Sequence, residues 1–251
     1  MKKIMAVDIS NYQLKDIRAN LDEPTTEALQ IVEGKMPVEF RIWDKHEYGS
    51  LIKTINVPSP FGVILFYEPL SLPKIFHELM HLHCSICFGY NSCMLPKEDD
   101  HYWYKYLLTE DFCEYFLNNA EHTVIQSYYI NAGYQPEDFF ESYTDPSEKV
   151  KQFLSMTFKA NGKYSAAMIT NYMRLCTHLL SFPFDKRYLP LVKQIKMVDY
   201  PLFTIFNKFF SDYFDTEILE DNGDYIQQCY QEFREGIDRW IRKNQNNILI
   251  P

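Results

Sequence analysis

Residues 61–88 of this 251-residue chain read FGVILFYEPLSLPKIFHELMHLHCSICF. The first seven of them form an apolar run, rich in β-branched and aromatic side chains, between Pro60 and Pro69. This composition predicts a buried strand. Pro73 suits the first turn of a helix, and neither proline nor glycine occurs from Lys74 to Phe88. The stretch therefore predicts a strand, a short loop and a helix.

Five residues of the predicted helix, His77-Glu78-Leu79-Met80-His81, have the pattern H-E-x-x-H. Residues four apart on a helix lie on one face, about 6 Å apart along the axis, so the imidazoles of His77 and His81 can both point at one ion. Glu78 is rotated by roughly 100° from His77, and its carboxylate can reach a water beside that ion without being a ligand. The pattern predicts a metal site that activates water.

At these residues the chain resembles the zincins, metallopeptidases whose active-site helix carries this motif. The resemblance is close around the motif and weak in the segment that follows. It implies that His77 and His81 bind zinc, that Glu78 is the general base, and that the substrate is a peptide or protein. The metzincin continuation is absent, because Cys84 and Cys87 stand where that branch has Gly and His. The third ligand is therefore expected from elsewhere in the chain.

The gluzincin branch takes its third ligand from a later helix, and the segment from Tyr104 to Ile130 contains no proline or glycine. Its apolar residues recur at helical spacing and predict one long helix with a single apolar face. A helical projection places Asn118 and Glu121 along one edge of that face, with His122 on the far side of this edge. A carboxylate at such an edge needs a partner, and a metal ion is one.

The predicted metal site therefore consists of His77, His81 and one of Glu121 and His122, with the other of these two in support. The edge position favours Glu121, whereas imidazole is the commoner zinc ligand. Three further candidates for the third ligand remain open: Glu110, Glu114 and His101.

A C-x-x-C pattern follows the motif at Cys84 and Cys87, and Cys93 lies nearby. Because the predicted helix continues through Cys87, we interpret these two residues as buried thiols rather than as a zinc knuckle or a redox pair. Cys84 cannot share an ion with His77, since about 10.5 Å of helix axis separates them. The remaining histidines are expected to pack in the core or to face solvent: His46, His83, His101 and His178.

The composition excludes several classes of function. The chain is 46% hydrophobic and 16% aromatic, enough for a sizeable core, and its formal net charge is −9. This acidity, without a cluster of Lys and Arg, argues against nucleic acid and membrane surfaces as partners. No apolar run approaches the roughly eighteen residues of a membrane span, and the start lacks a secretory leader. Six scattered cysteines predict a reducing cytoplasm.

Strand patterns come early in the chain and helical patterns late. Strands are expected at 3–9, 38–43 and 61–67, and a first helix within 14–32, interrupted near Pro24. Later helices are expected from Asp145 to a stop at Asn161-Gly162, over Ser165 to Ser181, along Leu202 to Phe214, and from Asp224 onward. We therefore expect an α+β fold with a small N-terminal β-sheet and the active-site helix in residues 1–144, packed on a mostly helical lobe in residues 145–251.

Two functions follow from these patterns. The first is a zinc-dependent hydrolase, expected to be a peptidase in which Glu78 takes a proton from water and returns it to the leaving amine. The alternative is a catalytically silent zincin-like binding or regulatory protein that acts through its helical lobe. The intact Glu78 favours the hydrolase, because a purely structural metal site does not need this carboxylate.

Overall fold

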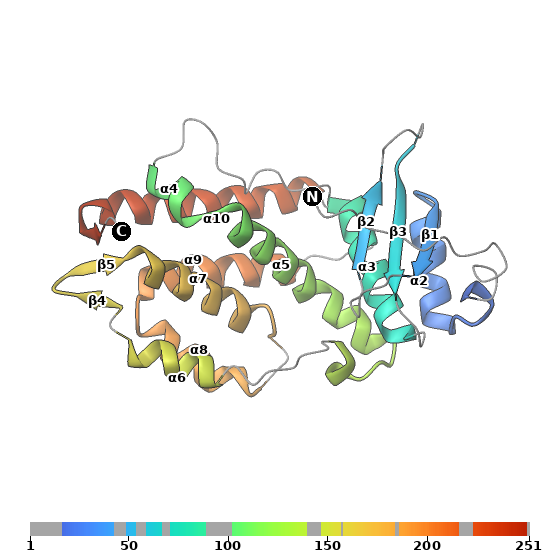
Figure 1. Cartoon of the computed structure of the whole chain (residues 1–251), viewed down its shortest axis with the longest axis horizontal. Coiled ribbons are helices and arrows are strands. Elements are labelled where there is room, and N and C mark those ends of the chain that lie inside the picture. The colour runs from blue at the N-terminus through green and yellow to red at the C-terminus, as the bar shows by residue number, and fades with distance from the viewer. Residues whose placement is uncertain are drawn as a thin grey trace. The chain divides into compact units, whose positions relative to one another are not determined.

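The computed structural model describes residues 17–42, 49–53, 59–66, 71–88, 102–139, 147–156, 158–183, 186–215 and 223–249 (Figure 1). The chain divides into two compact units. The first unit is Met1–Gly89 with Ile125–Tyr143, and the second is Tyr90–Val124 with Thr144–Pro251. The segment 90–124 thus groups with the second unit, whereas the sequence-based division at residue 144 had placed it in the first.

The first unit contains the predicted small sheet and the motif helix. Its elements are α2 (Glu23–Glu33), β1 (Val38–Ile42), β2 (Gly49–Lys53), β3 (Phe61–Phe66), α3 (Leu72–Phe88), the end of α5 (Glu110–Asn131) and η2 (Pro136–Phe139). The strand order is β1-β3-β2, with β1 parallel and β2 antiparallel to β3. The predicted strand at 3–9 lies outside the described residues.

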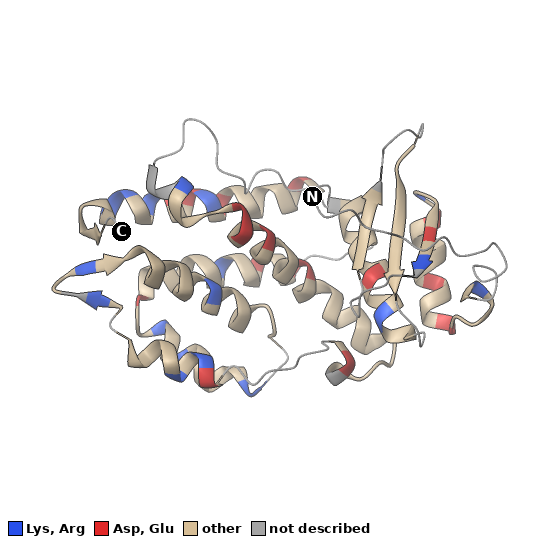
Figure 2. Cartoon of the chain, in the orientation of Figure 1, with Lys and Arg blue, Asp and Glu red and all other residues tan. Residues whose placement is uncertain are grey.

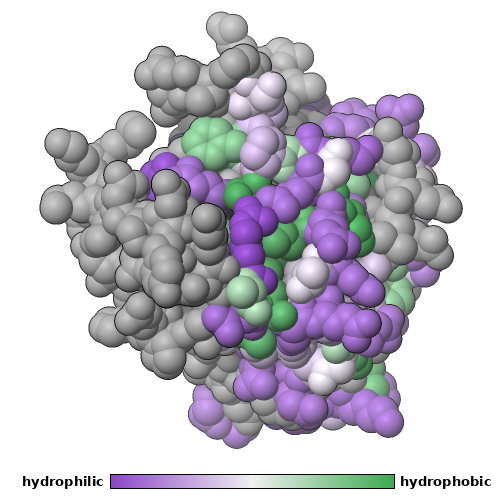
Figure 3. Space-filling view, turned by 90° about the vertical axis from the view of Figure 1, so that its right-hand side faces the viewer, coloured by the Kyte–Doolittle hydropathy of each residue, from purple (hydrophilic) through white to green (hydrophobic). Residues whose placement is uncertain are grey.

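Strand β3 is the buried centre of this sheet, and helix α3 packs against it. Gly62 permits their close approach, because a Cβ at this position would lie 2.6 Å from Cδ1 of the buried Leu82. The absent side chain lets the strand lie directly beneath the motif helix. On the face of the first unit that Figure 3 presents, mostly hydrophilic residues surround a narrow band of hydrophobic ones.

The start of helix α2 is fixed by an N-cap residue and by a tyrosine distant in the sequence. Asp22 is its N-cap and accepts a hydrogen bond from the Thr25 backbone N–H at 3.1 Å, so Pro24 lies in the first turn rather than interrupting a helix. The Tyr134 hydroxyl, beyond the end of α5, donates to the same carboxylate at 2.7 Å. This contact ties the start of α2 to the segment after α5 within the first unit.

The second unit is mainly helical. Its elements are α4 (Tyr102–Leu107), the start of α5, α6 (Ser147–Ser155), β4 (Lys159–Ala160), β5 (Lys163–Ser165), α7 (Ala166–Leu180), α8 (Tyr188–Lys196), α9 (Tyr200–Phe214), α10 (Gly223–Asn244), η3 (Gln245–Asn247) and β6 (Ile248–Leu249). A second small sheet has the order β4-β5-β6. The predicted α+β, mostly helical fold is therefore confirmed.

The expectation of one helix from Tyr104 to Ile130 was wrong. Helix α4 ends at Leu107 and α5 begins at Glu110. Between them, the Thr109 hydroxyl accepts a hydrogen bond from the Phe112 backbone N–H at 3.3 Å, and the Thr109 carbonyl accepts one from Cys113 at 2.9 Å. Thr109 thus caps a new helix, and Glu110 and Asp111 follow in its first turn, where acidic side chains are favourable.

The interpretation of Asn161-Gly162 as the end of a helix was also wrong. Helix α6 ends earlier, at Ser155. Asn161 has φ 50° and Gly162 has φ 80°, and the two residues connect the antiparallel strands β4 and β5. Two successive positive φ angles are the signature of the hairpin turn that Asn-Gly favours. The dipeptide therefore reverses a hairpin rather than ending a helix.

Among the described helices, none is long and apolar enough to cross a membrane.

Candidate metal centre

The motif helix α3 starts where the sequence predicts. Pro73 lies in its first turn, and the Ile75 N–H donates to the Ser71 carbonyl at 3.0 Å. The helix packs on α2 and on strands β2 and β3. The apolar residues it buries there are Ile75, Phe76, Leu79, Met80 and Leu82. This packing holds the backbone on which His77 and His81 are mounted.

The two motif histidines meet on one face of α3. Their Nε2 atoms lie 2.9 Å apart, and their ring centroids lie 4.8 Å apart. His77 is 9% exposed, while His81 is half-buried. The predicted convergence of the two imidazoles is present.

His122 of helix α5 joins this pair. One ring nitrogen from each of His77, His81 and His122 lies within 4.8 Å of the others, and the three residues form a group that can hold a metal ion. His122 is 7% exposed. Helix α5 continues without a break from His122 into the first unit, where Tyr129 packs edge-on against Phe76 of α3 with a centroid distance of 6.1 Å.

Burial keeps His77 uncharged. Desolvation lowers its pKa well below the ordinary value, and the neighbouring His81 lowers it further. A hydrogen bond from the ring to the Phe139 backbone carbonyl opposes this shift only in part. Because Nε2 faces His81, the bond to Phe139 involves the other ring nitrogen, so Nε2 keeps its lone pair. The neutral ring is thus already in the form that binds metals.

The short helix η2 covers this histidine. The ring of Phe139 lies 4.4 Å from the His77 ring, measured between centroids, at an interplanar angle of 32°. Phe139 is itself buried, at 4% exposure. One residue therefore both accepts the His77 hydrogen bond and shields the imidazole from water, and the centre is apolar on this side.

Glu78 follows His77 on α3 and is half-buried. Lys74, one helical turn earlier, is attracted to the carboxylates of Glu78 and Asp138, while partial burial lowers its pKa. Glu78 thus places a carboxylate on the same helix as the two motif histidines, next to His77 in the chain.

Of the two candidates for the third ligand, the structure brings His122 rather than Glu121 into the group. Glu121 is half-buried and is not a member. The argument for Glu121 assumed one apolar face with an exposed edge, but α5 is buried on all sides from His122 to Gln126. Asn118, expected in support, is exposed. Of the other candidates, Glu110 and Glu114 are exposed, and His101 lies outside the described residues.

Two further residues of α5 were not singled out by the sequence. Gln126 and Tyr129 are buried, and the Oε1 of Gln126 and the hydroxyl of Tyr129 have no hydrogen-bond partner in the described part of the chain. They follow His122 by four and seven residues, so all three share one face of the helix. A buried polar atom left without a partner costs about 1–3 kcal/mol. A bound water could satisfy such atoms.

The other cysteines and histidines considered in the sequence analysis are not members of the metal group within the described residues. Both cysteines lie on α3 and neither forms a disulfide within the described residues; Cys84 is buried, as predicted, whereas Cys87 is half-buried. His83 is buried, and desolvation lowers its pKa. His178 is half-buried on α7. The residues His46 and Cys93 lie outside the described ranges.

Comparison with known proteins adds no further information about this centre. No protein-family model, no curated protein and no solved structure matches the chain. The case for a function therefore depends on the geometry of the group itself.

Proposed function

We propose that this chain is a zinc-dependent hydrolase, most simply a peptidase, with His77, His81 and His122 as the zinc ligands. The observation that carries the proposal is the third imidazole. An H-E-x-x-H string can arise by chance, but here a later helix brings a buried histidine to within 4.8 Å of the pair. Convergence from two helices is what a metal site requires and what a chance string does not predict.

The donor atoms suit zinc. Two nitrogen ligands on a tetrahedral zinc ion, with bonds of about 2.0–2.1 Å, lie about 3.3 Å apart. The His77 and His81 nitrogens are 2.9 Å apart, and the third is close enough that a small change in side-chain torsion would bring it to this spacing. Three nitrogen ligands leave a fourth position open, which is typical of catalytic rather than structural zinc.

The residues around the ligands have separable roles in this proposal. Zinc, when bound, lowers the pKa of a water molecule toward neutrality and polarises a carbonyl group. Glu78 accepts the proton from water and delivers it to the leaving amine. Lys74 attracts the Glu78 carboxylate from one helical turn away. Phe139 holds the His77 ring in one tautomer and keeps bulk water away from it.

The decisive experiment is Glu78→Gln, measured with a library of fluorogenic peptides and with elemental analysis. We expect about one zinc per chain in both proteins, and hydrolysis slower by roughly 100- to 10,000-fold in the variant. Glu114→Gln is the matched control, because Glu114 is exposed on α5 and outside the metal group. Full activity of Glu78→Gln would rule out the base role, and a wild-type chain without stoichiometric zinc would rule out the metal centre.

One observation favours the alternative function, a catalytically silent binding or regulatory protein. His77 and His122 are 9% and 7% exposed, and Phe139 covers the first of them. Burial of this degree also suits a metal that only stabilises the fold. In that case zinc would bind at one per chain, while wild type and Glu78→Gln would be equally inactive on every peptide of the library.

A further inference from the structure

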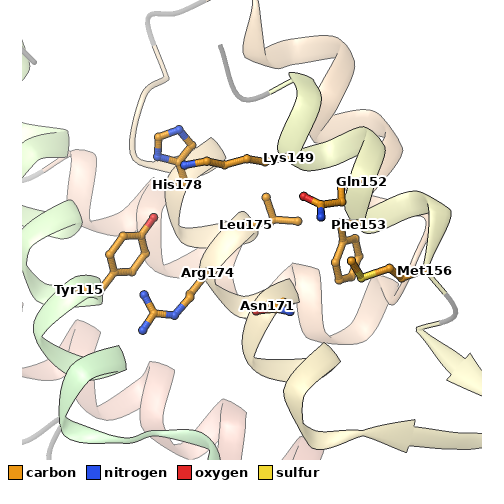
Figure 4. Close-up of a pocket in the computed structure, with 9 residues that line it drawn as sticks. All are labelled: Tyr115, Lys149, Gln152, Phe153, Met156, Asn171, Arg174, Leu175 and His178. Atoms are coloured by element: carbon orange, nitrogen blue, oxygen red, sulfur yellow. The ribbon is translucent and has the colours of Figure 1, made fainter. Parts of the chain in front are cut away.

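A cleft of about 360 Å³ lies within the second unit, between helices α5, α6 and α7 (Figure 4). We refer to it as the α6–α7 cleft. Its lining residues are Tyr115, Lys149, Gln152, Phe153, Met156, Asn171, Arg174, Leu175 and His178. Phe153 and Leu175 are buried and form an apolar floor, while Met156 extends this apolar surface at 43% exposure. The remaining lining residues are polar, so the cleft combines an apolar floor with a polar rim.

The rim is positively charged. Lys149 and Arg174 line the cleft, and none of its nine lining residues is acidic. Within the described residues, Lys149 makes no hydrogen bond or ion pair. The side chain extends from α6 toward His178 of α7 (Figure 4). Figure 2 shows that basic residues of the second unit recur on α6, α8 and the β4–β5 hairpin, whereas the start of α5 is acidic.

Arg174 is held across the cleft from α6. Its guanidinium pairs with Asp111 and lies 5.0 Å from the centre of the Tyr115 ring. The Asp111 side chain is 86% exposed, so solvent screens this ion pair and a second anion can share the guanidinium. This cation–π contact with Tyr115 holds the guanidinium without using its N–H donors.

Uncharged polar groups complete the rim. Tyr115, Gln152 and Asn171 make no side-chain hydrogen bond within the described part of the chain. Burial raises the pKa of Tyr115 to about 12, so its phenol is a donor at neutral pH. Burial lowers the pKa of His178 to about 4, so this ring adds no charge there. The rim therefore offers two cations and several donors, none of its lining residues is acidic, and the exposed Asp111 competes for Arg174 from outside the lining.

We propose that the α6–α7 cleft binds a small organic carboxylate with an apolar body. The volume is at the lower end of the range for small-molecule sites, which is about 300–1,000 Å³. Lys149 and Arg174 supply two positive charges, and Asp111, which pairs with Arg174, offsets one of them. One remaining charge matches a carboxylate better than a phosphate monoester, which carries about −1.5 to −2. The apolar floor formed by Phe153 and Leu175 suits an aromatic or aliphatic body.

The test uses 3-phenylpropionate as the probe, with the full chain and isothermal titration calorimetry. Lys149→Gln should weaken binding about five- to tenfold, because it removes a charge that has no other partner. Lys151→Gln is the matched control: Lys151 lies on the same helix, pairs with Glu148 at 2.7 Å and does not line the cleft. That variant should bind within about twofold of wild type.

Three further ligands test whether binding needs a negative charge, whether a carboxylate is preferred to a phosphate, and whether the carboxylate is that of a free acid or of a peptide end. The uncharged 3-phenylpropanamide should bind at least fivefold more weakly than the acid, and phenyl phosphate should bind no more tightly. The peptide Gly-Gly-Phe with a free carboxyl end tests whether the acid is a peptide terminus. Tighter binding of this peptide than of 3-phenylpropionate supports the same carboxylate site with a peptide end as its ligand, and weaker binding supports a free acid.

Four results would overturn the proposal. The first is no saturable binding of 3-phenylpropionate at concentrations up to about 10 mM. The second is equal binding of the amide, and the third is tighter binding of phenyl phosphate. The fourth is binding that Lys149→Gln leaves unchanged, which would place the acid elsewhere, including at the metal centre. Lys149 is exposed, so its replacement does not threaten the fold.

Discussion

The two halves of helix α5 are both buried, but by different kinds of residue. In the first half, the ring of Phe116 is fully buried, and its centroid lies 4.4–6.4 Å from five aromatic rings of α9 and α10. In the second half, His122, Gln126 and Tyr129 are buried, and the last two carry polar atoms without a hydrogen-bond partner among the described residues.

This difference separates scaffold from site. Burial of an aromatic ring stabilises the fold in proportion to the area removed from water, whereas burial of an unpartnered polar atom costs free energy. Hydrophobic periodicity treats the two halves of α5 as one pattern. The hydrogen bonding of the buried polar groups distinguishes the two halves: the second half contains His122 of the candidate metal group and two buried polar atoms without a partner among the described residues.

The largest effect is expected from His122→Ala. Removing a ligand should lower zinc affinity by more than the roughly 100-fold that changes around the ligands produce. Glu121→Ala is the matched control, since Glu121 is the adjacent residue and lies outside the metal group; it should stay within about tenfold. Competition with a chromophoric chelator measures both. If Glu121→Ala had the larger effect, the third ligand would be misassigned.

A mutation in the first half should act on stability instead. Phe116→Ala should lower the free energy of unfolding by about 3–5 kcal/mol, because it leaves a cavity among the rings of α9 and α10. Denaturant unfolding followed by circular dichroism measures the change, and elemental analysis of the folded fraction should still find one zinc per chain. A loss below about 1 kcal/mol would show that this half is not tightly packed.

The smallest effect tests the cost of an unpartnered atom. Gln126→Met removes the buried Oε1 at nearly constant volume, so the metal-free chain should gain about 1 kcal/mol in unfolding free energy. Zinc affinity should fall in the same variant if the amide supports the centre. Thr123→Val is the contrasting variant. It removes a buried hydroxyl that does have a partner, because the Thr123 hydroxyl donates to the Asn119 carbonyl at 3.0 Å, so it should not stabilise the chain. A loss of stability in Gln126→Met would mean that the amide is satisfied.

Local patterns were enough to predict the framework of the site. The apolar run of β3, the start of α3 at Pro73 and the pairing of His77 with His81 each depend on residues close in sequence. Helices α7, α9 and α10 were predicted for the same reason, since their apolar residues recur at helical spacing. The structure confirms these elements.

The remaining features depend on tertiary contacts or on signals that were misinterpreted. The third member of the metal group could not be chosen from the apolar pattern of α5. This part of the helix is buried on all sides, so it has no exposed edge from which its rotation could be predicted. Strand β2 was missed because it is short and half-exposed, and it gains its stability from pairing with β3. The cap at Thr109 has a signal in the sequence, Thr109-Glu110-Asp111, which is typical of a helix start. It was missed because the segment contains no proline or glycine and was therefore predicted as one helix.

The burial of His77 beneath Phe139 also bears on how the candidate centre would exchange protons with solvent if it took up an ion. A thiol ligand must lose a proton to bind a metal, so uptake by thiols releases acid and strengthens as the solution becomes more alkaline. The His77 ring is neutral well below its ordinary pKa and presents a bare Nε2. A metal ion that bound this nitrogen in the neutral pH range would therefore displace no proton from it.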